Sequence, residues 1–357
     1  MSDPHDSRSV ASRAFPAMDQ KGERLATDCH SPASDNAAHA GRPPAPESGR
    51  ADGPVDPVVA PAASHVRLLR GLILDEIVKA FGLPASGWPR RPVKWLFRIP
   101  AQRFAQLGAE FDLYLARGGF AEAARRVLPR FISDWRAYGT EHIPLQGPLL
   151  VVSNHPGAYD VLVVAANLTR DDLKVLAAGV PFLRSFSAAD QGLIFAGRDL
   201  HTRATALRAA IRHLDAGGAL LIFPSGTIDH DPEIGSVAQD EPAQWSSSIE
   251  WMLRRVPETS VLVTIVSGVV ARACYYNPLT RLRRGAVERR RLAELIQIAG
   301  QLVLGRTASL VPKVSFAAPV TVPGLGTRDD VASAMQAIIA RAQYTMAQHL
   351  SIVPHLA

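Results

Sequence analysis

A histidine and an aspartate stand just after an apolar run near the middle of the chain. The run, Leu149–Ser153, is typical of a buried strand, and His155 and Asp160 follow it. Five residues on an ideal helix turn by about 500°, so two helical side chains at this spacing would not share a face. The pair can meet if His155 lies on the turn and Asp160 lies on the first turn of a helix. Pro156 is typical of such a helix start.

This pairing would have a chemical use. A carboxylate on one ring nitrogen fixes the tautomer of a histidine and leaves the other nitrogen available as a general base. The alternative is a histidine that merely caps the helix and an aspartate that is only solvated.

Two further segments carry groups that can bind an anion. A second apolar run, 219–223, stops at Pro224, and Ser225, Gly226 and Thr227 form a turn whose backbone N–H groups can surround an anion. Arg198 follows another short apolar run and can clamp an anion with two parallel hydrogen bonds. The alternatives are an ordinary turn and a surface salt bridge with Asp199. Ser225 lacks the glycine elbow of a hydrolase nucleophile.

Together the three segments resemble the glycerolipid acyltransferase family, which includes the lysophosphatidic acid (1-acylglycerol-3-phosphate) acyltransferases. Asn154-His155 with Asp160 matches the Asn-His-x4-Asp block of that family, and residues 192–198 match its Gly-x-Ile-Phe-x-x-Arg block. Residues 223–227 are similar to its Phe-Pro-Glu-Gly-Thr block. The resemblance covers residues 138–320, with the blocks in the family order.

The resemblance implies transfer of an acyl group from a coenzyme A or acyl carrier protein thioester to a hydroxyl of a lysophospholipid or related lipid. His155 would be the general base and Asp160 would orient it. Arg198, with Ser225 and the backbone of Gly226 and Thr227, would hold the acceptor. The thioester is a co-substrate, and neither a metal nor another cofactor is expected.

The third block departs from the family pattern. The family glutamate is Ser225 here, and the arginine that often follows the threonine is Ile228. The next residues, 229–233, form an acidic loop, which we interpret as a solvated turn rather than a metal site. A catalytically altered member that binds a lipid or acyl chain without turnover is therefore the alternative function.

The order of elements predicts an α/β fold, with a mixed, largely parallel sheet flanked by helices. Strands are expected at 149–153, 173–177, 219–223, 261–266 and 314–317, and helices at 158–168, 202–215 and 329–350. N-terminal helices are expected from about Val66 to the stop at Gly82-Leu83-Pro84, over 101–117 and over 120–135. Chemistry in such a sheet gathers at the carboxyl ends of the strands.

Composition divides the chain of 357 residues into unequal parts. Residues 1–62 contain nine of the 27 prolines and few large apolar side chains, which predicts a disordered tail. The domains are expected at 63–137, a helical N-terminal region, and 138–357, an acyltransferase-like α/β domain. The tail carries a net charge of −3 and residues 63–357 carry +9, which favours anionic partners.

Two basic segments are candidates for membrane contact. Residues 89–98 interleave arginines and a lysine with Trp95 and Phe97, which suits either a membrane interface or a linker packed on the core. Six arginines between Arg281 and Arg291 precede an apolar helix, which favours a membrane surface over the alternative of a structural helix with a solvated basic end. Nucleic acid is disfavoured there because no aromatic residues accompany the arginines. Two cysteines cannot form a disulfide framework, and neither a signal peptide nor a spanning segment is visible. We therefore expect a cytoplasmic protein, peripheral on the inner face of the membrane.

Overall fold

The computed structural model describes residues 47–48, 61–84, 87–88, 90–157, 159–197, 199–234, 238, 241–245, 248–307, 309–321 and 328–352. The tail predicted over 1–62 lies outside the described residues except at 47–48 and 61–62. The chain divides into two units, 1–43 and 44–357, and all described residues belong to the second.

The described strands form one mixed sheet in the order β1-β2-β8-β7-β3-β6-β4-β5, with β9 paired to β7. The central strands β7, β3, β6, β4 and β5 run parallel to one another, whereas β8 and β9 pair antiparallel with β7. The predicted α/β class with a largely parallel sheet is therefore confirmed. The strands are β1 (Glu47–Ser48), β2 (Arg136–Tyr138), β3 (Leu149–Ser153), β4 (Lys174–Ala178), β5 (Leu193–Ala196), β6 (Ala219–Ile222), β7 (Ser260–Ser267), β8 (Lys313–Phe316) and β9 (Val320–Thr321).

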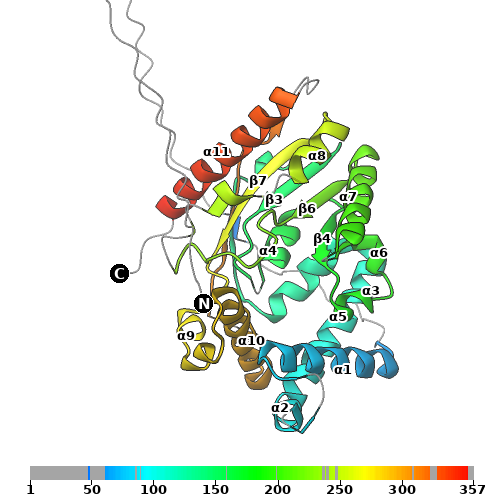
Figure 1. Ribbon diagram of the computed structural model, residues 1–357, viewed down its shortest axis with the longest axis vertical. Coiled ribbons are helices and arrows are strands. Elements are labelled where there is room, and N and C mark those ends of the chain that lie inside the picture. The colour runs from blue at the N-terminus through cyan, green and yellow to red at the C-terminus, as the bar shows by residue number, and fades with distance from the viewer. Residues whose placement is uncertain are drawn as a thin grey trace, which may run out of the picture. The chain divides into compact units, whose positions relative to one another are not determined.

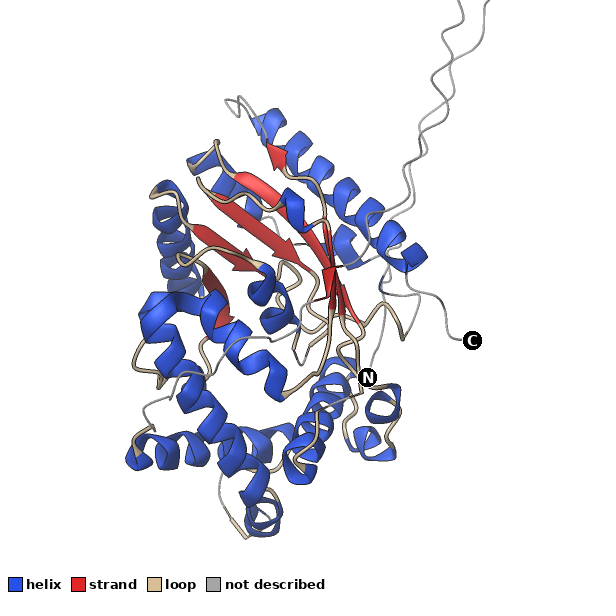
Figure 2. Ribbon diagram, turned by 180° about the vertical axis from the view of Figure 1, so that it is seen from behind, coloured by secondary structure: helices blue, strands red, loops and turns tan. Residues whose placement is uncertain are grey.

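Helices cover both faces of the sheet (Figure 1; Figure 2). They are α1 (Ala63–Ala80), α2 (Arg90–Leu96), α3 (Arg98–Val127), α4 (Asp160–Asn167), α5 (Pro181–Arg184), α6 (Ala189–Gly192), α7 (Leu200–Asp215), α8 (Ser248–Arg255), α9 (Arg272–Tyr275), α10 (Ala286–Leu304) and α11 (Arg328–Ile352). Short 3-10 turns are described at Leu128–Arg130, Thr140–His142, Glu241–Gln244 and Pro278–Leu282.

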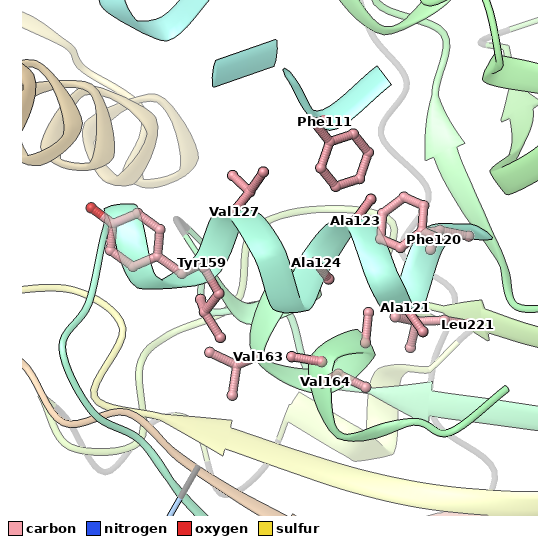
Figure 3. Packing of buried hydrophobic residues seen from close by; sticks show 14 of the residues in the cluster. Phe111, Phe120, Ala121, Ala123, Ala124, Val127, Tyr159, Val163, Val164 and Leu221 are labelled. Carbon is pink, nitrogen blue, oxygen red and sulfur yellow. The ribbon is translucent and has the colours of Figure 1, made fainter. Parts of the chain in front are cut away.

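Alternate residues of the central strands enter two separate cores. Leu149 and Val151 of β3 face α1, α3 and α4, and Leu150 and Val152 face α7, α8 and α11. All four are fully buried, which explains why β3 reads as a continuous apolar run. Figure 3 shows the first core, where the last turns of α3 lie on Val163 and Val164 of α4. The first turn of α4 is thereby fixed against the longest helix of the N-terminal region.

The N-terminal helices differ from the predicted bounds. The two blocks expected at 101–117 and 120–135 are joined in α3, with non-helical backbone at Gly118 and Gly119. Gly119 has φ +74°, and a Cβ there would lie 2.3 Å from the backbone oxygen of Asp171, so only glycine fits this kink. The helix then ends at Val127 instead of Trp135. The strand β2 spans the boundary expected at 137/138 and pairs with β8.

No helix in the described part of the chain is both long and apolar enough to cross a membrane.

Candidate active site

The carboxyl end of β3 is fixed to the neighbouring strand by a side chain. The buried amide of Asn154 donates to the backbone oxygen of Val266 at 2.9 Å and accepts from the Val266 N–H at 2.8 Å. The side chain thus pairs with both the N–H and the C=O of one β7 residue at the point where β3 ends. This contact sets the direction in which the following turn begins.

His155 and Asp160 meet across that turn, which is one of the two arrangements that their spacing left open. Nδ1 of His155 lies 2.6 Å from Oδ2 of Asp160, which is buried in the first turn of α4. The same carboxylate accepts the backbone N–H groups of Gly157 at 2.8 Å and Val161 at 2.5 Å. Three donors on one buried carboxylate fix its position, and the 31% exposed imidazole keeps Nε2 available for a substrate.

The loop after β6 holds His155 from the other side. The backbone N–H of His155 donates to Oδ2 of Asp229 at 2.7 Å, and the N–H of Asp229 donates to the backbone oxygen of His155 at 2.7 Å. The imidazole also stacks on Phe223, with ring centroids 4.4 Å apart. Two neighbouring strand ends therefore position one histidine.

Three carboxylates set the proton affinity of His155. Removal from water lowers its pKa, but the negative charges of Asp160, Glu294 and Asp229, with the hydrogen bond that the imidazole donates to Asp160, outweigh that effect and raise the pKa to about 9. For Asp229, which is an acid, burial has the opposite effect and raises the pKa above its ordinary value. The imidazolium form is stabilised by this arrangement, and the neutral form that accepts a proton gains population as pH rises.

Side chains of α10 contact the turn between His155 and Asp160. A Cβ on Gly157 would lie 1.6 Å from Oε1 of Glu294, so this carboxylate occupies the space that any other residue at 157 would need. Gln301 accepts a hydrogen bond from the hydroxyl of Tyr159, the residue before Asp160, and donates to the backbone oxygen of Phe131 at 2.6 Å. The turn that carries the candidate base is thus supported by a helix more than 130 residues downstream.

The acidic loop 229–233 is not a solvated turn, and that interpretation was wrong. Asp231 is 2% exposed and accepts the backbone N–H groups of Gly268, Val269, Val270 and Glu233 at 2.9–3.2 Å. Burial raises the pKa of Asp231 to about 6. The described residues contain no group of three or more His, Cys, Asp or Glu side chains arranged to hold a metal ion. The loop instead uses its carboxylates to fix the chain after β7.

Arg290 also departs from its predicted place in a membrane-facing cluster. It donates to the backbone oxygen of Ile228 at 2.7 Å and lies 2.8 Å from Nε2 of His230. His230 in turn contacts Glu241 at 2.5 Å. Arg290 therefore ties α10 to the loop after β6.

The predicted acceptor-binding residues Ser225, Gly226 and Thr227 form the turn after β6. The Ser225 hydroxyl donates to the backbone oxygen of Thr227 at 2.9 Å. Gly226 has φ +65°, and its N–H donates to the backbone oxygen of Phe223 at 3.1 Å. Arg198 lies outside the described residues. Its neighbours follow β5, and Asp199 caps α7 by accepting the backbone N–H of Thr202 at 2.9 Å.

Several site residues were missed because their partners are distant in sequence. Of these residues, only Asp229 could have been found from the sequence. It follows the end of a strand, and in a parallel sheet the ends of neighbouring strands lie close together. Glu294, Gln297 and Gln301 recur at helical spacing on α10, but nothing in the sequence indicates which loops they contact. Gln297 binds the loop after β7 by accepting from the Ala271 N–H at 2.7 Å and donating to Val269 at 2.8 Å.

Comparison with known proteins supports the resemblance seen in the sequence. Residues 134–266 match the family model described as Acyltransferase. No curated protein matches the chain significantly. Among solved structures, the chain is similar to the 1-acyl-sn-glycerophosphate (LPA) acyltransferase PlsC from Thermotoga maritima, with 14% identity, a TM-score of 0.36, and coverage of 80% of this chain and 96% of that chain. The matched residues include both His155 and Asp160 and the loop after β6.

Proposed function

We propose that this protein transfers a fatty acyl group from a thioester of coenzyme A or acyl carrier protein to a hydroxyl of a lysophospholipid or a related lipid. The observation that carries the proposal is the 2.6 Å contact between His155 and the buried Asp160, at a strand end inside the acyltransferase match. In this O-acyltransferase, His155 is the general base and Asp160 is its positioning residue. A 1-acylglycerol-3-phosphate is the first acceptor to test.

The chemistry needs one proton transfer and one substitution at a carbonyl. Nδ1–H of His155 donates to Asp160, so Nε2 accepts the proton of the acceptor hydroxyl. The hydroxyl oxygen then attacks the thioester carbonyl carbon, the carbon–sulfur bond breaks, and the thiolate leaves and takes up the proton as a thiol. Because a thioester is already activated, positioning and this base are sufficient, and the proposal includes no metal or other cofactor.

Acceptor binding is assigned to the ends of β5 and β6. Arg198 would pair with a phosphate, and Ser225, Gly226 and Thr227 would contact the acceptor through the turn after β6. The Gly226 N–H and the Ser225 O–H both donate within the turn, so the Thr227 N–H and the lone pairs of the Ser225 oxygen are the groups of this turn that can contact the acceptor. Their bond to each other is long, at 3.4 Å, which favours exchange for a ligand.

Exposed aromatic residues support binding to the surface of an anionic membrane. Trp88 and Trp95, before and within α2, are 78% and 67% exposed, and Leu96 and the basic Arg91 are exposed beside them. The helix is held to α1 by Asp75, which pairs with Lys94 at 2.5 Å and Arg90 at 3.2 Å. Tryptophan and basic residues together suit the headgroup region, so we assign the protein to the inner face of the membrane as a peripheral protein.

The alternative is a catalytically altered member that binds a lipid or an acyl chain without turnover, as Ser225 and Ile228 suggested. Purified protein incubated with labelled acyl-CoA and a panel of lysolipids separates the two functions, because only an enzyme gives labelled diacyl product. We expect product from the wild type and none from His155→Ala, which should retain the circular dichroism of the wild type. Turnover by His155→Ala would contradict the proposed base.

A further inference from the structure

Exposed apolar and basic side chains gather on α9 and on the 3-10 turn that follows it. These residues, here called the α9 patch, are Arg272, Tyr276, Leu279, Arg281, Leu282 and Arg284. Both α9 and the 3-10 turn pack on α10, and Figure 1 shows α9 beside that helix. The α9 patch therefore lies on a part of the molecule whose packing is fixed by a long helix.

The leucines of the α9 patch face outward although the residue between them faces inward. Leu279 and Leu282 are 50% and 64% exposed, whereas Thr280 is 6% exposed and donates its hydroxyl to the backbone oxygen of Asn277 at 2.7 Å. The side chain of Asn277 also accepts the backbone N–H of Leu279 at 3.0 Å. The turn thus buries a hydroxyl and exposes two leucines. Apolar side chains gathered at one exposed place, rather than scattered singly, are typical of an interaction surface.

The charge around the α9 patch has one sign. Residues 259–287 contain four arginines, no lysine and no acidic residue. One of these arginines, Arg272, donates to the backbone oxygen of Glu233 at 3.0 Å, which holds the patch beside the loop after β6. A partner that complements this surface carries negative charge together with apolar side chains.

The α9 patch also lies next to the candidate base. Tyr275, which precedes Tyr276 of the patch, lines a small pocket together with Pro156 and Asp229. Pro156 follows His155 directly, and Asp229 accepts the backbone N–H of His155 at 2.7 Å. A partner bound to the patch can therefore deliver a group on a flexible arm to the imidazole.

The composition of the α9 patch favours a protein partner over a lipid surface. Its cations are all arginine, which binds carboxylates through two parallel hydrogen bonds, and its aromatic residue is a tyrosine. Arginine and tyrosine are enriched at protein interfaces, whereas lysine is depleted there. The surface around α2 differs, because it presents the exposed Trp88 and Trp95 with Lys94 nearby, as suits a lipid headgroup region. The two surfaces thus suit different partners.

We propose that the α9 patch binds an acidic carrier protein, which bears the acyl thioester on a flexible arm and presents it to His155. Acidic side chains of the carrier pair with Arg281 and Arg284, and apolar side chains of the carrier cover Leu279 and Leu282. The carrier-bound thioester is thereby the preferred donor of the two named above. Delivery to His155 rests on the proposed function, whereas binding of the carrier does not.

Binding is measured first, without turnover, between the full chain and fluorescently labelled holo-acyl carrier protein by anisotropy. We expect saturable binding that the double variant Arg281→Glu/Arg284→Glu weakens at least about tenfold, because attractive charge pairs become repulsive. Arg254→Glu/Arg255→Glu is the matched control, since it makes the same change of charge at two exposed, adjacent arginines of α8. The control should leave the affinity within about twofold of the wild type.

Leu279→Ser/Leu282→Ser tests the apolar part of the α9 patch without a change of charge. It should weaken carrier binding at least about fivefold, because the leucines no longer contribute buried apolar surface. Both side chains are exposed, so this variant replaces the charge-reversed one if the latter does not fold by circular dichroism. Unchanged affinity in both double variants would overturn the proposal, and so would absence of carrier binding by the wild type.

Steady-state kinetics then compares acyl carrier protein and coenzyme A as carriers of the same acyl chain. Arg281→Glu/Arg284→Glu should raise the KM for the carrier-protein donor at least about tenfold and leave the KM for acyl-CoA within about twofold. An equal rise with both donors would contradict the proposal, since the patch would then bind the phosphates of coenzyme A. Failure of transfer from either donor, with carrier binding intact, would instead count against the proposed function alone.

Sedimentation with phosphatidylglycerol vesicles separates the carrier protein from a membrane as the occupant of the α9 patch. Arg281→Glu/Arg284→Glu should bind these vesicles within about twofold of the wild type, because the α2 surface is unchanged in this variant. A variant that lost vesicle binding and kept its affinity for the carrier would overturn the proposal in favour of a lipid surface.

Discussion

The loops after β3 and β6 both bring buried carboxylates to the same edge of the sheet, and they use them differently. Asp160 accepts from an imidazole as well as from two backbone amides. Asp231 accepts from four backbone amides and from no side chain among the described residues. A carboxylate that accepts from an imidazole can orient that ring, whereas one that accepts only from amides fixes a loop. The partner, rather than the presence of the acid, decides its use.

Asp160→Asn tests the chemical half of this comparison and has the largest expected effect. An amide has one oxygen, so it cannot accept from the imidazole, Gly157 and Val161 as both carboxylate oxygens do. Without a correctly oriented base, kcat/KM for acyl transfer should fall by about 10²–10⁴-fold. The urea midpoint of the variant serves as the control for folding. A loss of activity of less than about threefold would mean that Asp160 is structural, like Asp231.

Asp231→Ala tests the structural half. The substitution leaves several buried backbone N–H groups without their acceptor, and the free energy of unfolding should fall by about 3 kcal/mol. Urea denaturation measures this loss, and Asp215→Ala, at an exposed residue, should change stability by about 0.5 kcal/mol or less. The activity of the folded protein should change far less than in Asp160→Asn. The comparison would be wrong if Asp231→Ala abolished turnover at unchanged stability.

The pH dependence of turnover tests whether the surrounding carboxylates act on His155. Since Asp160, Glu294 and Asp229 raise the pKa of His155 to about 9, the neutral base and therefore kcat/KM should increase with pH through that value. Glu294→Gln removes one of these charges and should move the rise to lower pH, by about one unit or less. A pH–rate profile of each protein gives the result. An unchanged profile would show that Glu294 does not act on the base.

The same pKa has a consequence for stability with a definite sign. A histidine whose pKa rises from 6.5 to about 9 on folding stabilises the folded state fully below its unfolded pKa, and this contribution is lost as pH rises through about 9. Wild-type protein should therefore lose more unfolding free energy than His155→Ala between about pH 6 and pH 10. Urea titrations at both pH values measure the difference. Equal losses in the two proteins would contradict a raised pKa.

Sequence reasoning succeeded where the partners are near one another in the chain. The His155–Asp160 contact follows from a strand, a turn and a helix start within about a dozen residues, and the sheet class follows from alternating elements. It failed where the partner is a backbone group far away, as for Asp231, whose partners include amides of 268–270. It failed again for Arg290, since a basic residue before an apolar helix has the same pattern whether it faces lipid or a buried carbonyl. Those contacts are fixed by how α10 packs, and no local spacing encodes that packing.

Ser225→Ala gives the smallest expected effect and sharpens the contrast between the two strand ends. The Ser225 hydroxyl is bonded to Thr227 within its own turn, whereas His155 has a buried carboxylate behind it. Losing one hydrogen bond to the acceptor should cost about 1 kcal/mol, so kcat/KM should fall about fivefold, through KM rather than kcat. A nucleophilic serine would behave otherwise: the wild type would react with a fluorophosphonate, and the alanine variant would lose kcat by several orders of magnitude. Steady-state kinetics over the lysolipid panel therefore decides whether the loop after β6 holds the acceptor or takes part in bond breaking. A loss confined to KM would mean that Ser225 contributes only to binding and that His155, after β3, is the group that transfers the proton.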